Sequence, residues 1–175
     1  QRVTGSPVDE YLRDQYLGPL GLTHTSMRRV DFEDELFAPL SSGTLDHQVV
    51  AWIFNSKRIR GSLMPAASLH STAREMAIFY QMLLNNGEYA GKRFLEPETV
   101  NLMTSLGYEG FDQSLGRRTR WGYGFFLGGD HILHPEYMDG MGRGSSIETF
   151  GHYGQRNSMV WADKKTELVV VFLCN

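Results

Sequence analysis

The segment 158-SMVWADKKTELVVVFL-173, close to the end of the chain, constrains the fold more than any other part of the sequence. Two runs rich in β-branched and aromatic residues flank a polar stretch, which predicts a strand, a turn at Asp163–Lys165 and a second strand. The longest apolar run, 168-LVVVFLC-174, has the length of a strand and is far shorter than the roughly 18 residues that cross a bilayer. This end of the chain therefore predicts antiparallel strands, and no membrane span is expected.

Helical signals precede these strands. The clearest lies in 72-TAREMAIFYQMLLNN-86, where Thr72 and Glu75 form a capping box and Gly87 provides a stop. A second helix, with proline at its first position, is predicted at 97-PETVNLMTS-105. Helices followed by antiparallel strands are typical of an α+β fold. Since neither an internal repeat nor a linker is visible, residues 1–175 are predicted to be a single domain or a fragment of one.

The remaining segments give weaker signals. A first helix is predicted at 6-SPVDEYLRDQYL-17, with Ser6 as its cap and Asp9 completing a capping box. From there to about Ser62 the acidic, weakly patterned sequence predicts mostly loop with short helical or strand pieces. The segment 121-WGYGFFLG-128 predicts a strand that another group approaches closely. Polar, glycine-rich stretches on either side of it predict surface loops, at 107–120, with the solvated arginines Arg117, Arg118 and Arg120, and at about 129–146.

Composition and local motifs exclude several classes of function. With 17 Lys and Arg against 20 Asp and Glu, the net charge is −3, which gives no reason to expect a nucleic-acid partner. The one cysteine, Cys174, cannot form an internal disulfide and leaves the compartment open. The only close histidine pair, His131 and His134, lacks the three or four convergent ligands of a zinc site, so no metal is expected. Because a predicted strand rather than a helix follows 140-GMGRGS-145, this run is not expected to bind phosphate, and no cofactor is expected.

His152 lies between two glycines in 150-FGHYGQRNS-158, just before the final strands. For an isolated histidine in such a position, a structural role at a strand end is the favoured interpretation. No Gly-x-Ser-x-Gly nucleophile elbow occurs in the chain, and Cys174 lies within a strand pattern. Residue patterns alone therefore predict a compact α+β domain without a complete catalytic set.

Three stretches, in order, resemble the serine β-lactamase family, which includes class C β-lactamases, D-alanyl-D-alanine peptidases and related esterases. The first, 10-EYLRDQYLGPLGLTHTSM-27, is similar to the family's helix ending in Pro-Leu-Gly-Met-x-x-Thr. The second, 61–103, is similar to its Ser-Thr-Ala-x-Asp helix and the Pro-Glu-Thr-Val segment that follows. The third, 121-WGYGF-125 with 151–175, is similar to its ending, which contains the motif Gly-His-x-Gly. The resemblance covers most of the chain and is weakest between Val30 and Arg60.

The resemblance implies a role for the segment around His152. His152-Tyr153-Gly154 matches the third motif of the family, in which an edge strand presents backbone N–H groups to a developing oxyanion. The backbone N–H of Gln155 would then be one oxyanion donor, while Gly154 would allow the close approach of substrate and nucleophile. His152 would place a polar or cationic group beside the substrate. Three aromatic residues would contact the substrate or line its pocket, although such residues are more often core: Tyr153, Trp121 and Tyr123.

The first two motifs of the family are missing. None of the residues three positions before a lysine is serine, so Ser-x-x-Lys does not occur; neither Tyr-x-Asn nor Ser-x-Asn occurs. The Gly-Gly-Leu that follows the proline in the family is also altered, since Ala66, Ala67 and Ser68 precede Leu69. In the family both missing motifs lie before the Pro-Leu-Gly-Met helix, so they are expected upstream of Gln1. The sequence thus predicts the C-terminal part of a longer serine hydrolase, inactive on its own because acyl transfer needs the activated serine.

Two hypotheses follow for the whole protein. The first is a serine hydrolase that cleaves an amide or ester in a small-molecule or peptide substrate through an acyl-enzyme. The sequence does not distinguish a β-lactam, a peptidoglycan peptide, an ester and a small amide. The alternative is a non-catalytic β-lactamase-like module that binds a ligand or partner or scaffolds an assembly, with which the missing motifs are compatible. In either case, a chain without the earlier strands of the family would expose a sheet edge, so a partner segment, self-association or additional residues are expected.

Overall fold

A computed structural model describes residues 2–28, 37–41, 44–128, 141–142, 144–154 and 158–174, without the side chain of Asp46. The chain divides into two compact units. One comprises Gln1–Glu75 and Leu173–Asn175, and the other comprises Met76–Phe172.

The first unit begins with a short helix, α1 (Val8–Leu12), that continues into a π-helical turn at Arg13–Leu17. Pro7 is the N-cap residue, and no side chain caps the helix. The prediction that Ser6 caps it is therefore wrong. The Asp9 carboxylate instead forms an ion pair with Arg28, in which Nε and Oδ2 are 2.8 Å apart, so this carboxylate ties α1 to a distant part of the chain.

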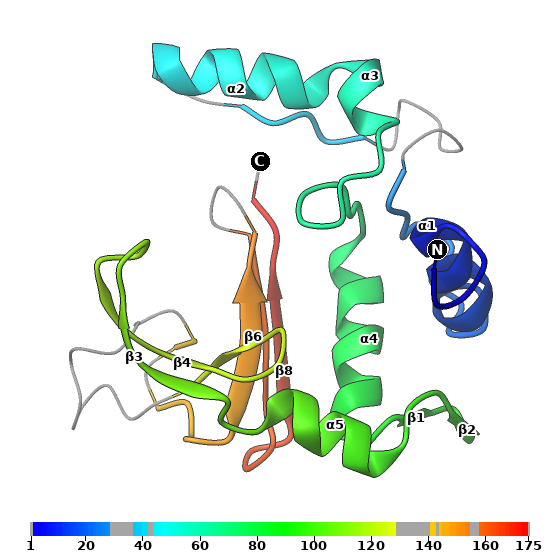
Figure 1. Cartoon of the computed structure of the whole chain (residues 1–175), viewed down its shortest axis with the longest axis vertical. Coiled ribbons are helices and arrows are strands. Elements are labelled where there is room, and N and C mark those ends of the chain that lie inside the picture. Colours follow the sequence, from blue (N-terminus) through cyan, green and yellow to red (C-terminus); the bar gives the residue numbers. More distant parts are fainter. Residues whose placement is uncertain are drawn as a thin grey trace. The chain divides into compact units, whose positions relative to one another are not determined.

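Two helices occupy the region that the sequence predicts as mostly loop. α2 (Leu45–Asn55) has 11 residues, and α3 (Lys57–Arg60) follows it after Ser56 (Figure 1). The sequence predicts short helical pieces in this region but not an 11-residue helix, because the apolar residues of α2 lie on all sides and no single stripe marks it as a helix. Ala51 is buried, whereas Trp52 on the same helix is 75% exposed.

The predicted helix at 72–86 is confirmed as α4 (Ala73–Leu84). Thr72 caps it, because the Glu75 N–H donates to Thr72 Oγ1 at 3.2 Å. At the other end, Gly87 has a φ of +89° and donates its N–H to Met82 O at 2.9 Å, which closes the last turn. The predicted second helix is also confirmed, as α5 (Pro97–Thr104) with Pro97 in the first turn. A small hairpin of β1 (Glu88–Tyr89) and β2 (Lys92–Arg93) separates the two helices.

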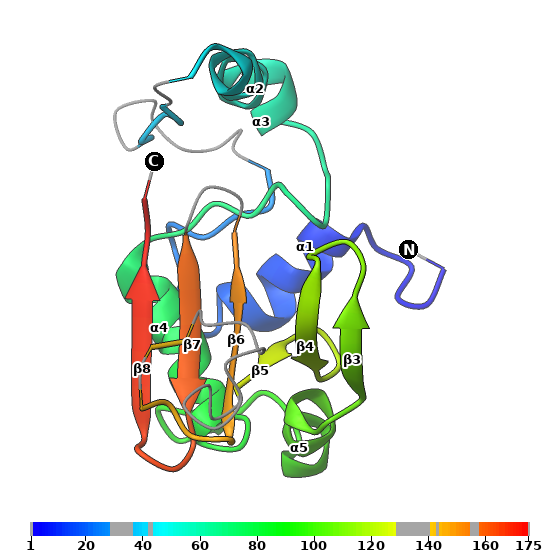
Figure 2. The ribbon, with the colours of Figure 1, turned by 90° about the vertical axis from the view of Figure 1, so that its left-hand side faces the viewer.

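Six antiparallel strands form the sheet of the second unit, in the order β3-β4-β5-β6-β7-β8 (Figure 2). Their bounds are β3 Tyr108–Asp112, β4 Arg117–Trp121, β5 Phe126–Leu127, β6 Thr149–Tyr153, β7 Met159–Asp163 and β8 Leu168–Phe172. The predicted strand pair at the end of the chain is thus confirmed. By contrast, the loop predicted at 107–120 is wrong, since β3 and β4 form a hairpin there. Polar residues dominate both strands, so no apolar alternation marks them in the sequence. Pairing between the strands, such as that of Phe111 with Arg118, stabilises them instead.

The main core of the second unit lies between α4 and one face of the sheet. Phe150 of β6 is fully buried, and its ring stacks on that of Tyr80 with centroids 5.9 Å apart. The Phe125 ring meets Phe150 edge-on at 5.4 Å. Burial raises the pKa of the Tyr80 hydroxyl well above its ordinary value, so this tyrosine remains protonated. A second cluster, built around Phe126, Met141 and Trp161, covers the opposite face of the strands.

A buried carboxylate holds the turn between β7 and β8. The side chain of Asp163 accepts hydrogen bonds from the Ser146 N–H at 2.8 Å, from Ser146 Oγ at 2.5 Å and from the Lys165 N–H at 2.9 Å. Burial alone would raise the pKa of Asp163, but these hydrogen bonds outweigh it and hold the pKa below its ordinary value. Asp163 therefore ends one strand and shapes the turn, as the sequence predicts for this position.

None of the helices in the described part of the chain is both long enough and apolar enough to cross a membrane. Across the same residues, no three His, Cys, Asp or Glu side chains come together in a way that could hold a metal ion.

Candidate active site

β6, the strand that carries His152, pairs with its two neighbouring strands over different lengths. β6 pairs with β7 along all five residues, from Thr149 to Tyr153. On its other side, β5 reaches only Phe150 and Gly151. The predicted edge strand is therefore an inner strand of the sheet, and its register with β5 covers only Phe150 and Gly151. The end of β6, at His152 and Tyr153, is the region that the sequence singles out.

The ring of His152 is exposed and oriented by the strand itself. Its Nδ1 lies 2.7 Å from the backbone oxygen of Tyr153. Because a carbonyl oxygen can only accept, Nδ1 must be the donor in this hydrogen bond. The other ring nitrogen, Nε2, has no partner among the described residues. In the neutral ring Nε2 therefore carries a lone pair that could accept a proton or a hydrogen bond from a bound molecule.

Two aromatic side chains lie beside the His152 ring. The centroid of the Phe126 ring is 5.3 Å away, and that of Trp121 is 6.0 Å away. The half-buried Tyr153 ring contacts the same Phe126 at 5.2 Å and belongs to the cluster on that face of the sheet. Of the predicted site residues, the structure thus brings Trp121, His152 and Tyr153 together around Phe126.

Two other predicted site residues lie apart from these ring contacts. Tyr123 is 59% exposed and donates its backbone N–H to Met103 O, and it makes no ring contact within the described residues. Gly154 follows β6 and donates its N–H to Ser158 O at 2.7 Å, so this N–H continues the pairing with the β7 side. The predicted oxyanion donor, Gln155, lies outside the described residues, as do His131 and His134.

Gly151 and Gly154, the glycines on either side of His152-Tyr153, differ in how much room their surroundings leave for a side chain. A Cβ atom on Gly151 would lie 2.4 Å from Val160 O and 2.6 Å from the Cβ of Trp161. On Gly154, the nearest atom to such a Cβ would be the Ser158 Cβ, at 3.2 Å. Gly151 is thus required by the close packing of β7. Sequence reasoning assigned the glycine requirement to substrate approach at Gly154 and missed this tighter contact, which only the strand register reveals.

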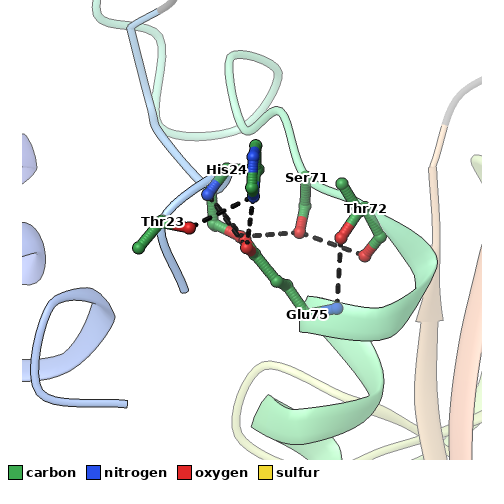
Figure 3. A network of polar contacts seen from close by, with 6 residues as sticks. Thr23, His24, Ser71, Thr72 and Glu75 are labelled. Atoms are coloured by element: carbon green, nitrogen blue, oxygen red, sulfur yellow. Dashed lines mark hydrogen bonds and ion pairs between the residues drawn. The ribbon is translucent and has the colours of Figure 1, made fainter. Parts of the chain in front are cut away.

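A polar network in the first unit surrounds the Glu75 carboxylate at the start of α4 (Figure 3). The carboxylate accepts hydrogen bonds from the His24 N–H at 2.9 and 3.0 Å, from His24 Nδ1 at 3.0 Å and from Thr25 Oγ1 at 2.6 Å. Thr25 Oγ1 is in turn 2.7 Å from Ser71 Oγ. Since Thr25 donates its only hydroxyl hydrogen to Glu75, Ser71 is the donor in that contact.

Burial alone would raise the pKa of Glu75, whose side chain is 7% exposed. The hydrogen bonds from Thr25 and His24 outweigh this effect and hold its pKa below the ordinary value. Glu75 is therefore an ionised, buried carboxylate with donors on both oxygens. Because these donors come from residues about 50 positions earlier in the chain, the network fastens the start of α4 to the loop that contains His24.

The network does not form a nucleophile–base pair. Ser71 Oγ contacts Thr25 and, at 3.3 Å, the backbone oxygen of Thr72, rather than a ring nitrogen. The prediction that Thr72 caps α4 is confirmed. Sequence reasoning missed the tie from Glu75 to Thr25, although both residues belong to stretches that carry the family resemblance.

The family model described as Beta-lactamase matches residues 1–175, the whole chain. The chain belongs to the Beta-lactamase family. The resemblance identified from the three sequence stretches is thereby confirmed. Membership of this family explains why the three stretches occur in this order along the chain, the first two in the helical part and the third in the sheet.

Curated relatives of this Beta-lactamase family chain carry one recurring description. A protein of Escherichia coli (strain K12), named "Putative D-alanyl-D-alanine carboxypeptidase", is 25% identical over 201 residues. The match covers 100% of this chain and 41% of the relative. A protein of Salmonella gallinarum with the same name is 23% identical, with the same coverage. The chain therefore spans about two fifths of the length of these relatives.

Solved structures show the same fold. A family VIII carboxylesterase superposes with a TM-score of 0.80 at 23% identity, over 99% of this chain and 47% of that one. A penicillin-binding protein homologue from Caulobacter crescentus superposes with a TM-score of 0.67 at 22% identity, over 99% of this chain and 48% of that one. At these identities the likeness concerns the fold alone, and it confirms the predicted α+β class.

Proposed function

We propose that this chain is part of a serine hydrolase that cleaves an amide or ester bond through an acyl-enzyme, and that His152, Gly154 and Gln155 form one wall of its site. The observation that carries the proposal is the orientation of the exposed His152 ring at the end of β6. There, His152 is exposed, its Nδ1 hydrogen is held by Tyr153 O, and Nε2 is left to a bound molecule.

Backbone alternation supports the role of the strand as an oxyanion donor. Antiparallel residues point their N–H groups alternately to one neighbouring strand and to the other. The Gly154 N–H points to the β7 side, where it donates to Ser158 O. Gly154 would therefore contribute its lack of a side chain, and the oxyanion donor of the proposal is the N–H of Gln155. Donors of this kind stabilise charge that develops in the transition state.

The aromatic residues near the strand end would form the substrate pocket. Trp121, half-buried and 6.0 Å from the His152 ring, is the best placed of them. Tyr153 would support the pocket from within the cluster around Phe126. Tyr123, more than half exposed, would contact the substrate from outside this cluster.

We propose further that the 175-residue chain alone has no serine-acyl chemistry, since Ser-x-x-Lys does not occur in it. Incubation with a fluorophosphonate probe, followed by mass spectrometry of the peptides, tests this directly. We expect no labelled serine and no turnover of nitrocefin or of a p-nitrophenyl ester. Labelling of any serine in this chain would contradict the proposal.

The decisive test of the enzymatic role uses the polypeptide translated from the complete gene. His152→Ala should lower kcat/KM by roughly 100-fold, the effect typical of one lost polar group at a reacting centre. His47→Ala, which changes an exposed histidine of α2, is the matched control and should leave turnover unchanged. Substrates would include a p-nitrophenyl ester, nitrocefin and a peptide ending in D-alanyl-D-alanine, the last chosen from the names of the curated relatives.

Each result bears on one part of the proposal. Unchanged turnover in His152→Ala would remove this residue from the mechanism. Absence of any turnover in the complete polypeptide, with intact folding, would favour the alternative of a non-catalytic module that binds a ligand or scaffolds an assembly.

A further inference from the structure

The exposed ring of His152 lies against a buried aromatic residue, Phe126 of β5. The two ring centroids are 5.3 Å apart, and the ring planes are tilted by 52°. His152 is exposed, whereas Phe126 is 7% exposed and belongs to the core cluster with Met141 and Trp161. Through Phe126, therefore, the hydrophobic core contacts the imidazole ring.

The backbone of Phe126 is paired on both sides. β5 has two residues, and Phe126 registers with Trp121 of β4 on one side and with Gly151 of β6 on the other. Its ring also packs on the Trp121 ring, with centroids 3.6 Å apart. Because paired backbone and a packed neighbour both restrict it, the Phe126 ring has little freedom to change its rotamer.

Gly151 explains how the Phe126 ring reaches His152. This position of β6, directly opposite Phe126, carries no side chain, and a Cβ atom there would lie 2.4 Å from Val160 O. An aromatic side chain opposite a glycine can extend over the neighbouring strand. The Phe126 ring accordingly contacts the two residues that follow Gly151, with centroids 5.3 Å from His152 and 5.2 Å from Tyr153.

The hydrogen bond from His152 Nδ1 to Tyr153 O, at 2.7 Å, does not fix the imidazole by itself. It joins adjacent residues, and an exposed side chain exchanges such a bond for one to water at little net cost. A neutral imidazole can also carry its proton on either ring nitrogen. A rigid neighbour that keeps the ring in place therefore keeps the proton on Nδ1 and the lone pair on Nε2.

We propose that Phe126 is a positioning residue for His152, whose imidazole it holds with Nδ1 on Tyr153 O and Nε2 toward the substrate. The inference rests on the proposed role of His152 and concerns a core residue that acts through this ring. Loss of orientation at a reacting group slows the chemical step more than it weakens substrate binding. Phe126 therefore acts on kcat rather than on KM.

Phe125 provides the matched control. Both phenylalanines are 7% exposed. Phe125 instead packs on Phe150 and Tyr80, with centroids 5.4 and 6.0 Å away, in the core beneath α4. Phe125→Leu and Phe126→Leu remove the same ring from equally buried positions, so both should lower the urea midpoint by similar amounts. A difference in turnover between them then reports the contact with His152 rather than lost stability.

The first experiment measures turnover by the polypeptide translated from the complete gene, with whichever of the substrates named above it cleaves. Phe126→Leu should lower kcat about 10-fold with KM within about 3-fold, whereas Phe125→Leu should leave both within about 2-fold. In a His152→Ala background, Phe126→Leu should cause less than about a 2-fold further fall, because no ring is left to position. Effects that multiply independently, or equal losses in the two leucine variants, would overturn the proposal.

The second experiment does not depend on turnover. In the same polypeptide labelled with ¹⁵N-histidine, at alkaline pH, the His152 signals are assigned by their loss in His152→Ala. They should show the Nδ1–H tautomer in wild type and in Phe125→Leu. Phe126→Leu should give a mixture of both tautomers. So should Phe126→Met, which fills the space with a flexible chain if leucine is not tolerated. An unchanged tautomer in the folded Phe126 variants would overturn the proposal.

The two experiments separate this inference from the proposed function. Unchanged turnover in His152→Ala contradicts the proposed function, and the tautomer then supports or overturns the orienting role of Phe126 on its own. A large fall in His152→Ala with normal turnover in Phe126→Leu leaves the proposed function standing and overturns the positioning role.

Discussion

At the start of α4, the buried Glu75 carboxylate accepts hydrogen bonds from His24 and Thr25 on both of its oxygens. At the end of β6, by contrast, the exposed His152 uses one ring nitrogen to bond Tyr153 O and leaves the other without a partner among the described residues. Both regions lie in stretches that resemble the Beta-lactamase family. A polar group whose bonding capacity is filled from within the chain stabilises the fold, whereas one with unused capacity is available to a ligand. Family resemblance alone does not separate these two roles, and hydrogen-bond partners do.

The largest expected effect is a loss of stability at Glu75, whose hydrogen-bonding capacity is filled from within the chain. Glu75→Ala leaves the His24 N–H and the Thr25 hydroxyl without an acceptor, and it should lower the free energy of unfolding by about 3 kcal/mol. Urea unfolding at neutral pH, followed by circular dichroism, measures this loss. Glu10→Ala, an exposed glutamate of α1, is the matched control and should change the value by less than about 0.5 kcal/mol. Equal effects of the two substitutions would show that the network contributes nothing.

The next effect compares Gly151, within β6, with Gly154, which follows this strand. Gly151→Ala places a Cβ 2.4 Å from Val160 O and should cost about 2 kcal/mol, since the strands must move apart. Gly154→Ala, where the nearest atom is 3.2 Å away, should cost less than about 1 kcal/mol, partly because alanine restricts the unfolded chain. Thermal unfolding of both variants makes the comparison. A larger loss at Gly154 would mean that the end of β6 is packed as tightly as its middle.

These contacts also mark the limit of what the sequence could predict. α4, α5 and the β7–β8 pair carry strong local signals: a capping threonine, a proline in the first turn, and dense β-branched runs. The β3–β4 hairpin carries none, because its strands are polar and gain their stability from pairing between residues such as Phe111 and Arg118. α2 escaped prediction because its apolar residues point in all directions rather than along one stripe.

In the candidate site, too, some residues could be predicted from the sequence and others could not. The glycine-flanked motif identified His152, and the neighbouring aromatic segment identified Trp121 as a residue that the fold brings to it. The need for Gly151 and the bond from Thr25 to Glu75 depend on register and on contacts between residues about 50 positions apart. No local pattern encodes such contacts, so only the folded chain reveals them.

A smaller change in stability is expected at acidic pH. The pKa of Glu75 in the folded chain lies below its ordinary value of 4.5, so the ionised form favours folding. This contribution is fully present above pH 4.5 and is lost as the pH falls through the folded pKa. Glu75→Gln, which cannot ionise, should therefore be less stable than wild type by on the order of 1 kcal/mol near neutral pH, and the gap should narrow below pH 4.5. Urea midpoints from pH 7 to pH 3, repeated with His24→Gln to separate the neighbouring ring, provide the measurement. A gap that stays constant over this range would contradict the assignment.

The smallest change in stability is expected at His152, the exposed residue in the comparison with Glu75. His152→Ala removes an exposed ring with one hydrogen bond and should alter the free energy of unfolding by less than about 0.5 kcal/mol. A sharper measurement concerns the ring itself. Because Tyr153 O can only accept, the neutral ring should carry its proton on Nδ1, which ¹⁵N-detected couplings of the imidazole nitrogens report directly. A ring protonated on Nε2 instead would lack the donor for Tyr153 O, and His152 Nε2 would no longer present a lone pair to a bound molecule.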